Sequence, residues 1–85
     1  MKDSTILITG GTGSFGNTVL RRLLIDNQFK EIRIFSRDEK KQDDMRHLYN
    51  NNKIKFFIGD VRDKDRLYRA FNGVDYVVHA AALKQ

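Results

Sequence analysis

The chain has 85 residues, of which 40% are hydrophobic and 32% are charged, and it contains neither cysteine nor proline. This length predicts one domain with a thin core, and the composition excludes a disordered chain. The lack of cysteine excludes disulfides, zinc–thiolate sites and a thiol nucleophile. No apolar run approaches a signal sequence or the roughly 18 residues of a membrane span, so we expect a cytoplasmic protein without a membrane span.

The net charge of +5 favours polyanionic partners such as nucleic acid, a membrane surface or phosphorylated small molecules. Lysine and arginine are spread along the chain in runs of at most two, and acidic residues lie between them. A nucleic-acid footprint would be clustered on one element. We therefore expect no nucleic-acid partner and interpret the charge mainly as a solvated surface.

Short apolar runs alternate with longer stretches of helical periodicity, in which apolar residues recur every three or four positions. The short runs predict strands at residues 5–9, 31–36, 53–58 and 74–79. The periodic stretches predict helices at residues 14–25 and 38–49 and a third helix after residue 63. Asp63 is the expected N-cap of the third helix, and Gly73 is expected to close it in a left-handed conformation.

The predicted order is β-α-β-α-β-α-β, and each connection is long enough for a right-handed helical return. This pattern predicts a parallel sheet with helices on both faces. We expect an α/β fold, the N-terminal half of a Rossmann-like doubly wound parallel sheet, with strand order 3-2-1-4.

The first chemical signal is the glycine-rich sequence TGGTGSFG, residues 9–16, between the first strand and the first helix. Such a loop brings backbone N–H groups and a helix N-terminus against a pyrophosphate. Gly10 would permit the tight turn, Gly13 the approach of the phosphates and Gly16 the packing of helix on strand. The alternative is a tight turn that binds nothing.

The second signal is the end of the second strand, about twenty residues past the loop, where a dinucleotide fold meets the adenosine ribose. Ser36 and Arg37 stand there instead of an acid, and a guanidinium pairs well with a 2′-phosphate. Lys40 and Lys41 would add positive charge. The sequence therefore predicts NADP as cofactor, with NAD less favoured, although the acidic pair 38–39 is also compatible with a solvated helix start.

Two further segments follow the third and fourth strands. Asp60 is placed to accept a hydrogen bond from an adenine amino group and Val61 to lie against the ring, although a lone aspartate is more often a helix cap. Ala80–Ala82 would leave room for a ribose or nicotinamide, and Lys84 could reach a phosphate or a ribose hydroxyl. We interpret His79 as a packing residue at the strand end.

Tyr49 and Lys53 form a Y-x-x-x-K pair like the one that short-chain dehydrogenases place on one helix face. Three asparagines separate them, and Lys53 opens the third predicted strand. We interpret the pair as a coincidence.

The segments TGGTGSFG, FSRDEKKQDDMR, FFIGDVRD and HAAALKQ resemble the N-terminal quarter of the extended short-chain dehydrogenase/reductase family. More narrowly they resemble bacterial UDP-N-acetylglucosamine 4,6-dehydratases of polysaccharide and capsule biosynthesis, some of which also epimerise C5. The motifs and the resemblance together give these candidate cofactor-binding residues: Gly10, Thr12, Gly13, Ser14, Phe15, Gly16, Ser36, Arg37, Asp38, Glu39, Lys40, Lys41, Asp60, Val61, Ala80, Ala81, Ala82 and Lys84.

The resemblance implies a lyase that oxidises C4 of the sugar and eliminates water across C5 and C6. It places the catalytic groups after the fourth strand, so we expect residues 1–85 to be a truncated NADP-binding domain of a longer enzyme. We expect no catalytic or metal-binding residue in the chain and no activity from it alone. Two alternatives remain: a UDP-sugar 4-epimerase, which typically uses NAD and would favour an acid near Ser36, and a non-enzymatic dinucleotide-binding module.

Association is also expected. The strand at residues 74–79 would have an unpaired outer edge that is apolar, β-branched and carries one charge, Asp75. We therefore expect a homo-oligomer, formed most simply by this strand and its two-fold mate.

Overall fold

The computed structural model describes residues 3–80. The elements in chain order are β1 (Thr5–Thr9), α1 (Ser14–Asp26), β2 (Glu31–Ser36), α2 (Glu39–Tyr49), β3 (Ile54–Ile58), α3 (Lys64–Phe71) and β4 (Tyr76–His79). The predicted alternation of strands and helices is confirmed. No helix in this described range is long and apolar enough to cross a membrane.

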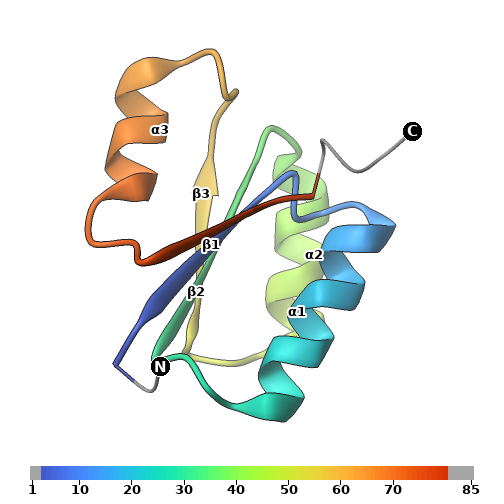
Figure 1. The fold of residues 1–85 in the computed structure, drawn as a ribbon. Coiled ribbons are helices and arrows are strands. Elements are labelled where there is room, and N and C mark those ends of the chain that lie inside the picture. The colour runs from blue at the N-terminus through green and yellow to red at the C-terminus, as the bar shows by residue number, and fades with distance from the viewer. Residues whose placement is uncertain (1–2, 81–85) are drawn as a thin grey trace.

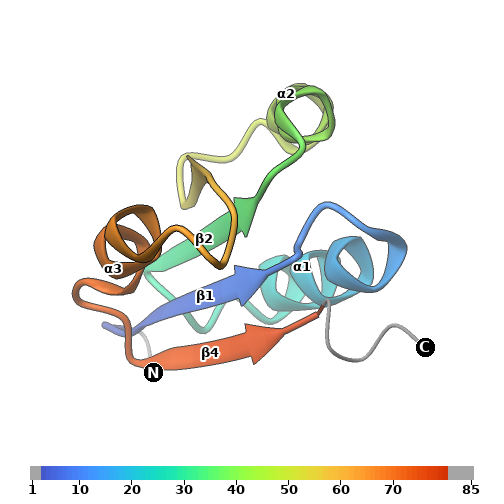
Figure 2. The same cartoon turned by 90° about the horizontal axis from the view of Figure 1, so that it is seen from above.

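The four strands form one parallel sheet in the order β3-β2-β1-β4, as the sequence predicts. Ile6 of β1 lies opposite Ile32 of β2 and Tyr76 of β4, and Ile32 lies opposite Ile54 of β3. Helices α1 and α2 cover one face of the sheet and α3 covers the other (Figures 1 and 2). The molecule is thus a three-layer, Rossmann-like α/β domain. Because the strands are parallel, their carboxyl ends all lie at the same edge of the sheet.

The core has two parts because successive strand residues point to opposite faces. Ile6 and Ile8 of β1 belong to the larger cluster, which also takes in Leu20 of α1 and Met45 of α2. Leu7, between them in sequence, belongs to the smaller cluster under α3. The central strands are therefore apolar on both sides, as buried parallel strands require.

The element ends differ slightly from the predictions. Lys53 lies before β3, because its N–H donates to Asn51 Oδ1 (2.9 Å) in the preceding turn. The fourth strand begins at Tyr76, since the N–H of Val74 donates to the carbonyl of Phe71 (2.9 Å) in the turn that ends α3. Gly73 has a φ of +79°, so the predicted left-handed residue after α3 is confirmed.

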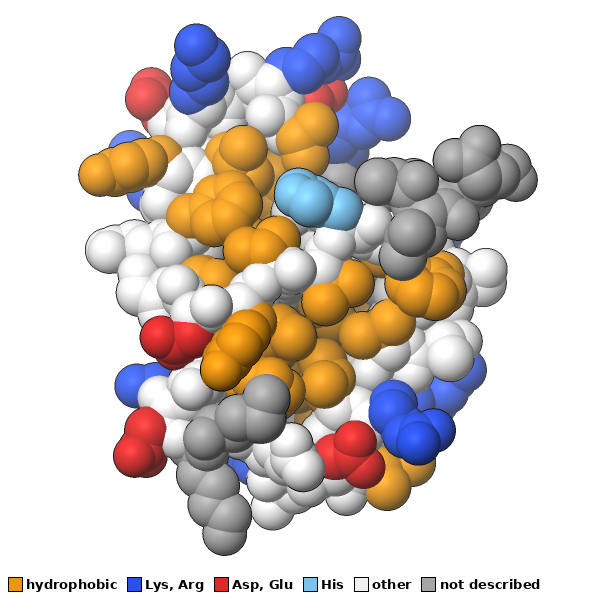
Figure 3. Space-filling model, viewed as in Figure 1, with side chains coloured by type: hydrophobic (Ala, Val, Ile, Leu, Met, Phe, Trp, Pro, Cys, Tyr) orange, Lys and Arg blue, Asp and Glu red, His pale blue; other side chains and the backbone are white. Residues whose placement is uncertain are grey.

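Strand β4 is the most exposed strand of the sheet. Among the described strands it pairs with β1 alone, and its Tyr76 and Val77 side chains are 46% and 38% exposed. Figure 3 shows hydrophobic side chains gathered on this side of the molecule. The structure thus agrees with the expected apolar outer edge, while association through it stays a prediction.

Candidate dinucleotide-binding site

A cleft of about 460 Å³ opens at the edge of the sheet where β1, β2 and β3 end. Its walls come from the glycine-rich loop, the end of β2 and the segment after β3. The residues that line it are Gly10, Thr12, Gly13, Ser14, Phe15, Gly16, Phe35, Ser36, Arg37, Asp38, Lys41, Gly59, Asp60, Val61, Arg62 and Ala80. The carboxyl ends of parallel strands are the usual place for a ligand in this fold.

The glycine-rich loop turns tightly above β1. Gly10 has a φ of +68°, which favours glycine, and its N–H donates to the carbonyl of Phe35 on β2 (2.8 Å). A Cβ atom on Gly16 would lie 2.5 Å from the backbone of Gly11, closer than real contacts allow. Gly16 therefore lets the first turn of α1 pack against the loop itself, rather than against the strand as predicted.

The loop is held by an asparagine of α1. Nδ2 of Asn17 donates to the carbonyl oxygens of Thr12 (3.3 Å) and Gly13 (3.0 Å), and its Oδ1 accepts from Tyr49 Oη (2.8 Å). Because a peptide unit is planar and trans, fixing the Gly13 carbonyl toward the helix aims the Ser14 N–H the opposite way. This places a backbone donor at the start of α1, beside the cleft.

The N-terminus of α1 has no side-chain cap: within residues 3–80 its N-cap, Gly13, makes no capping hydrogen bond, and its first turn contains no acidic residue. The first N–H groups of a helix lack intrahelical partners and carry positive partial charge. This end of α1 can therefore receive an anionic group.

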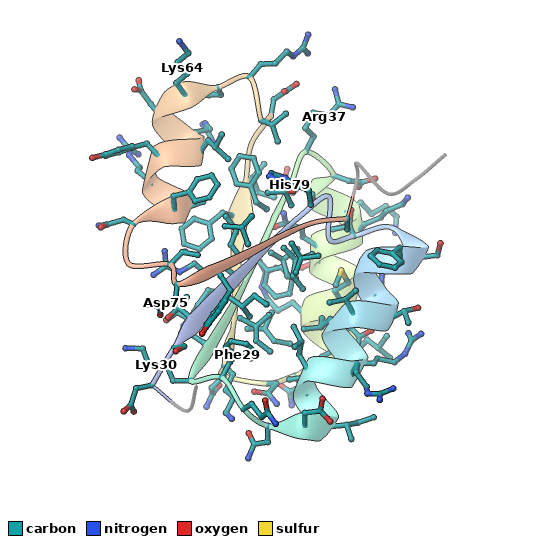
Figure 4. All side chains as sticks on the ribbon, in the orientation of Figure 1. Phe29, Lys30, Arg37, Lys64, Asp75 and His79 are labelled. Atoms are coloured by element: carbon teal, nitrogen blue, oxygen red, sulfur yellow. The ribbon has the colours of Figure 1, made fainter. Side chains whose placement is uncertain are left out.

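The end of β2 brings a hydroxyl and a guanidinium to the opposite wall. Ser36 is buried, at 8% exposure, whereas the Arg37 side chain is 75% exposed. Asp38 is the N-cap of α2 and accepts from the N–H of Lys41 (3.0 Å). Figure 4 shows Arg37 and His79 near the same end of the sheet, and Lys30 and Asp75 at the other.

Asp60 is ionised and paired with two arginines. Hydrogen bonds from the side chain and the N–H of Arg62 hold the pKa of the Asp60 carboxyl far below its usual range. The Arg62 Nη2 to Asp60 Oδ2 distance is 2.8 Å, the N–H of Arg62 donates to Oδ1 (2.9 Å), and Arg37 Nη1 lies 3.4 Å from Oδ2. The carboxylate thus joins the two arginines at the cleft.

Most of the candidate residues come together in this cleft, but not all. Glu39 and Lys40 are absent from its lining and border a separate hollow with Asp43, Arg46 and Ile58. Their place in the first turn of α2, beyond the capping Asp38, turns them away from the loop. Ala81, Ala82 and Lys84 lie outside the described residues.

Sequence reasoning missed three lining residues, Phe35, Gly59 and Arg62. A signal existed for Gly59, since a Cβ there would lie 2.9 Å from the Phe35 ring, and a glycine directly after a strand indicates such a close approach. Arg62 gave no signal, because an exposed arginine in a turn is ordinary.

His79 and the Y-x-x-x-K pair have structural partners. His79 is exposed and its Nδ1 lies 2.7 Å from Thr9 Oγ1, so it hydrogen-bonds to the neighbouring strand instead of packing in the core. Tyr49 ends α2 and bonds to Asn17, whereas Lys53 lies in the next turn and bonds to Asn27. Tyrosine and lysine therefore share no helix face. Among residues 3–80 no group of three or more acidic or histidine side chains is arranged to hold a metal.

The parallel sheet and the glycine-rich turn after β1 define a Rossmann-like domain of the kind found in short-chain dehydrogenases and reductases. A family model described as "Polysaccharide biosynthesis protein" matches residues 6–85, and the chain belongs to this family. Proteins named UDP-glucose 4-epimerase from Rickettsia felis and Rickettsia bellii are 66% and 67% identical over 86 aligned positions, with 98% of this chain covered. The chain spans about a quarter (25%) of the length of these relatives.

Solved structures agree on the fold. "X-ray structure of Pen from Bacillus thuringiensis" superposes with a TM-score of 0.82 at 38% identity, covering 89% of this chain and 23% of that chain. A putative 3-oxoacyl-reductase from Bacillus thuringiensis superposes with a TM-score of 0.74 at 21% identity, over 89% of this chain and 35% of that one. The second likeness shows the fold alone.

Proposed function

We propose that the cleft binds the adenosine and pyrophosphate portion of a nicotinamide dinucleotide, with NADP preferred over NAD. One observation carries the proposal: the uncapped N-terminus of α1 and the cationic end of β2 border the same cleft. The first suits a pyrophosphate and the second a 2′-phosphate. A solvated turn that binds no ligand would not require an uncapped helix N-terminus and a cationic strand end side by side.

The adenosine half would lie between the ends of β2 and β3. Ser36 and Arg37 would meet the 2′-phosphate, and Lys41, which also lines the cleft, would add a second positive charge. The ionised Asp60 would accept from the adenine amino group, with the exposed Val61 against the ring. The missing acid at position 36 supports NADP, because an acid there would bind the free 2′-hydroxyl of NAD.

We further propose that the intact protein acts on a nucleotide sugar in polysaccharide biosynthesis. A bound nicotinamide supplies hydride transfer, and removal of hydride from C4 of the sugar is the shared first step of 4-epimerisation and of 4,6-dehydration. The residues of this chain contribute cofactor binding and orientation to that step. We assign no catalytic group to them.

Of these two reactions we favour 4,6-dehydration of UDP-N-acetylglucosamine, with C5 epimerisation as a further step. The resemblance in the SRDEKKQ and AALKQ segments supports it, as does the serine–arginine pair that fits NADP. The second candidate is UDP-glucose 4-epimerisation, which the names of the Rickettsia relatives favour.

Incubation of the intact protein with each nucleotide sugar separates the candidates. A dehydratase releases one water from UDP-N-acetylglucosamine, which mass spectrometry detects, whereas an epimerase converts UDP-glucose to UDP-galactose without a change in mass. Dinucleotide binding without either product would support a non-enzymatic module and contradict the enzyme proposal. The 85-residue chain alone should produce neither product.

A further inference from the structure

Gln42 on α2 is fully buried, at 0% exposure, beneath the end of β2. Its Nε2 donates to the Phe57 carbonyl (2.9 Å) and to Ser36 Oγ (3.0 Å), and it lies 3.4 Å from the Ser36 carbonyl. One amide nitrogen thus links α2 to the ends of β2 and β3. Nothing in the sequence pattern assigns this residue a role.

The orientation of the amide follows from its neighbours. Both carbonyl oxygens can only accept hydrogen bonds, so the nitrogen must face them. Its Oε1 is then buried and has no hydrogen-bond partner within residues 3–80. Burying an unpaired polar atom destabilises a fold, so packing alone does not account for a glutamine at this position.

This orientation of the Gln42 amide determines which hydrogen bonds the Ser36 hydroxyl can make. Its Oγ receives hydrogen bonds from Gln42 Nε2 (3.0 Å) and from the N–H of Asp38 (3.3 Å), which use both lone pairs of the hydroxyl. The hydroxyl can then act only as a donor. No acceptor for it is found among residues 3–80, and Ser36 lines the cleft.

We propose that Gln42 is a positioning residue that fixes Ser36 as a donor toward the 2′-phosphate of NADP, and so helps select NADP over NAD. The proposal rests on the proposed cofactor site. A phosphate oxygen is a stronger acceptor than a ribose hydroxyl because it is charged. A serine locked as a donor therefore stabilises NADP more than NAD.

The test uses calorimetry on the intact protein with NADP and with NAD, comparing the ratio of the two Kd values. In the variant Gln42→Met, which keeps the side-chain length and loses the amide, the preference for NADP should fall by about tenfold or more. Gln28→Met, a matched change at an exposed loop position, should leave the ratio unchanged. A purely structural role of Gln42 would weaken both cofactors equally and leave the ratio unmoved, which would overturn the proposal.

Ser36 variants keep the proposal testable if Gln42→Met does not fold. Ser36→Ala should lower the ratio by a similar factor and Ser36→Thr should retain it. Where Gln42→Met does fold, adding it to Ser36→Ala should lower the ratio no further. An unchanged ratio in Ser36→Ala would overturn the inference alone, whereas a wild-type protein that binds neither dinucleotide would overturn the proposed cofactor site as well.

Discussion

Helix α1 begins differently from α2 and α3. Asp38 and Asp63 cap α2 and α3 with their side chains, accepting from the N–H groups of Lys41 (3.0 Å) and Arg66 (3.3 Å). Both helices also carry an acid in the first turn, whereas α1 has the glycine N-cap Gly13 and no acid there. In α2 and α3 a side chain of the protein caps the first turn, whereas the first turn of α1 has no side-chain cap and borders the cleft.

The side-chain caps of α2 and α3 stabilise those helices, whereas the uncapped start of α1 leaves backbone N–H groups available to a ligand. An aspartate cap stabilises a helix by about 0.5–2 kcal/mol relative to alanine, and acids in the first turn add to it. Helix α1 lacks this stabilisation at its start, where the glycine-rich loop and the helix border the cleft. An external anion that binds there would supply the missing charge.

The variant Gly13→Asp would give α1 the kind of cap that α2 and α3 have. A Cβ at Gly13 has open space, its nearest neighbour being the Gly10 carbonyl at 3.9 Å. Stability should rise by a few tenths to about 1 kcal/mol in thermal unfolding. Dinucleotide affinity should fall by about 100-fold or more, because a carboxylate would stand against the pyrophosphate. Unchanged affinity would show that the pyrophosphate lies elsewhere.

The opposite wall is tested by Arg37→Ala. The change removes the guanidinium proposed to meet the 2′-phosphate, so NADP binding should weaken by about 1.5–3 kcal/mol more than NAD binding. Calorimetry on the intact protein measures both. Equal losses for the two cofactors would contradict the assignment.

The packing of α1 on its loop is tested by Gly16→Ala. The added methyl would meet the Gly11 backbone at 2.5 Å, and the shift should cost about 1–3 kcal/mol in chemical unfolding and weaken dinucleotide binding. Gly13→Ala, which meets no close neighbour, is the matched control and should cost less than about 1 kcal/mol. Similar costs for the two variants would be the contrary outcome.

The smallest expected effect concerns pH. The hydrogen bonds from Arg62 lower the pKa of Asp60 in the folded protein, so this pair stabilises the fold above the ordinary aspartate pKa of about 3.9. The contribution is lost as the pH falls below that value toward the folded pKa, and it is small because the Arg62 side chain is exposed. A ¹³C titration should find Asp60 still ionised at the ordinary pKa. In Arg62→Ala the Asp60 midpoint should move up; an unmoved midpoint would show that Arg62 is not the cause of the lowered pKa.

The sequence predicted the strand order and the position of every helix and strand to within about two residues. It did so because the short β-branched runs of the strands and the periodic apolar stretches of the helices occupy separate segments of the chain. In addition, Asp63 and Gly73 mark the ends of α3. It could not predict the burial of Gln42, since nothing in a charged helix distinguishes a buried glutamine from a solvated one. Such residues become visible only when α2 is placed over the ends of β2 and β3.

A residue of the candidate site could be predicted from the sequence where the local backbone conformation strongly favours one residue type. Gly10 with its positive φ is such a case. Ser36 and Arg37 line the cleft as expected, while their contact with a 2′-phosphate stays a prediction. Glu39 and Lys40 were assigned from the resemblance, and Lys40 also from its place one helical turn past Ser36; they border a separate hollow and not this cleft. Arg62 was missed because its link to Asp60 depends on the shape of the turn after β3.

The most direct measurement is an amide NMR titration of the intact protein with NADP. We predict large shifts for the N–H groups of Ser14 to Gly16, at the open start of α1, together with the Arg37 side chain. The capped start of α3 provides the internal comparison: Asp65 and Arg66 are not among the residues that line the cleft, so their amides should not move. Shifts at Asp65 and Arg66 with none at Ser14 to Gly16 would contradict the proposal that the open start of α1 receives the pyrophosphate.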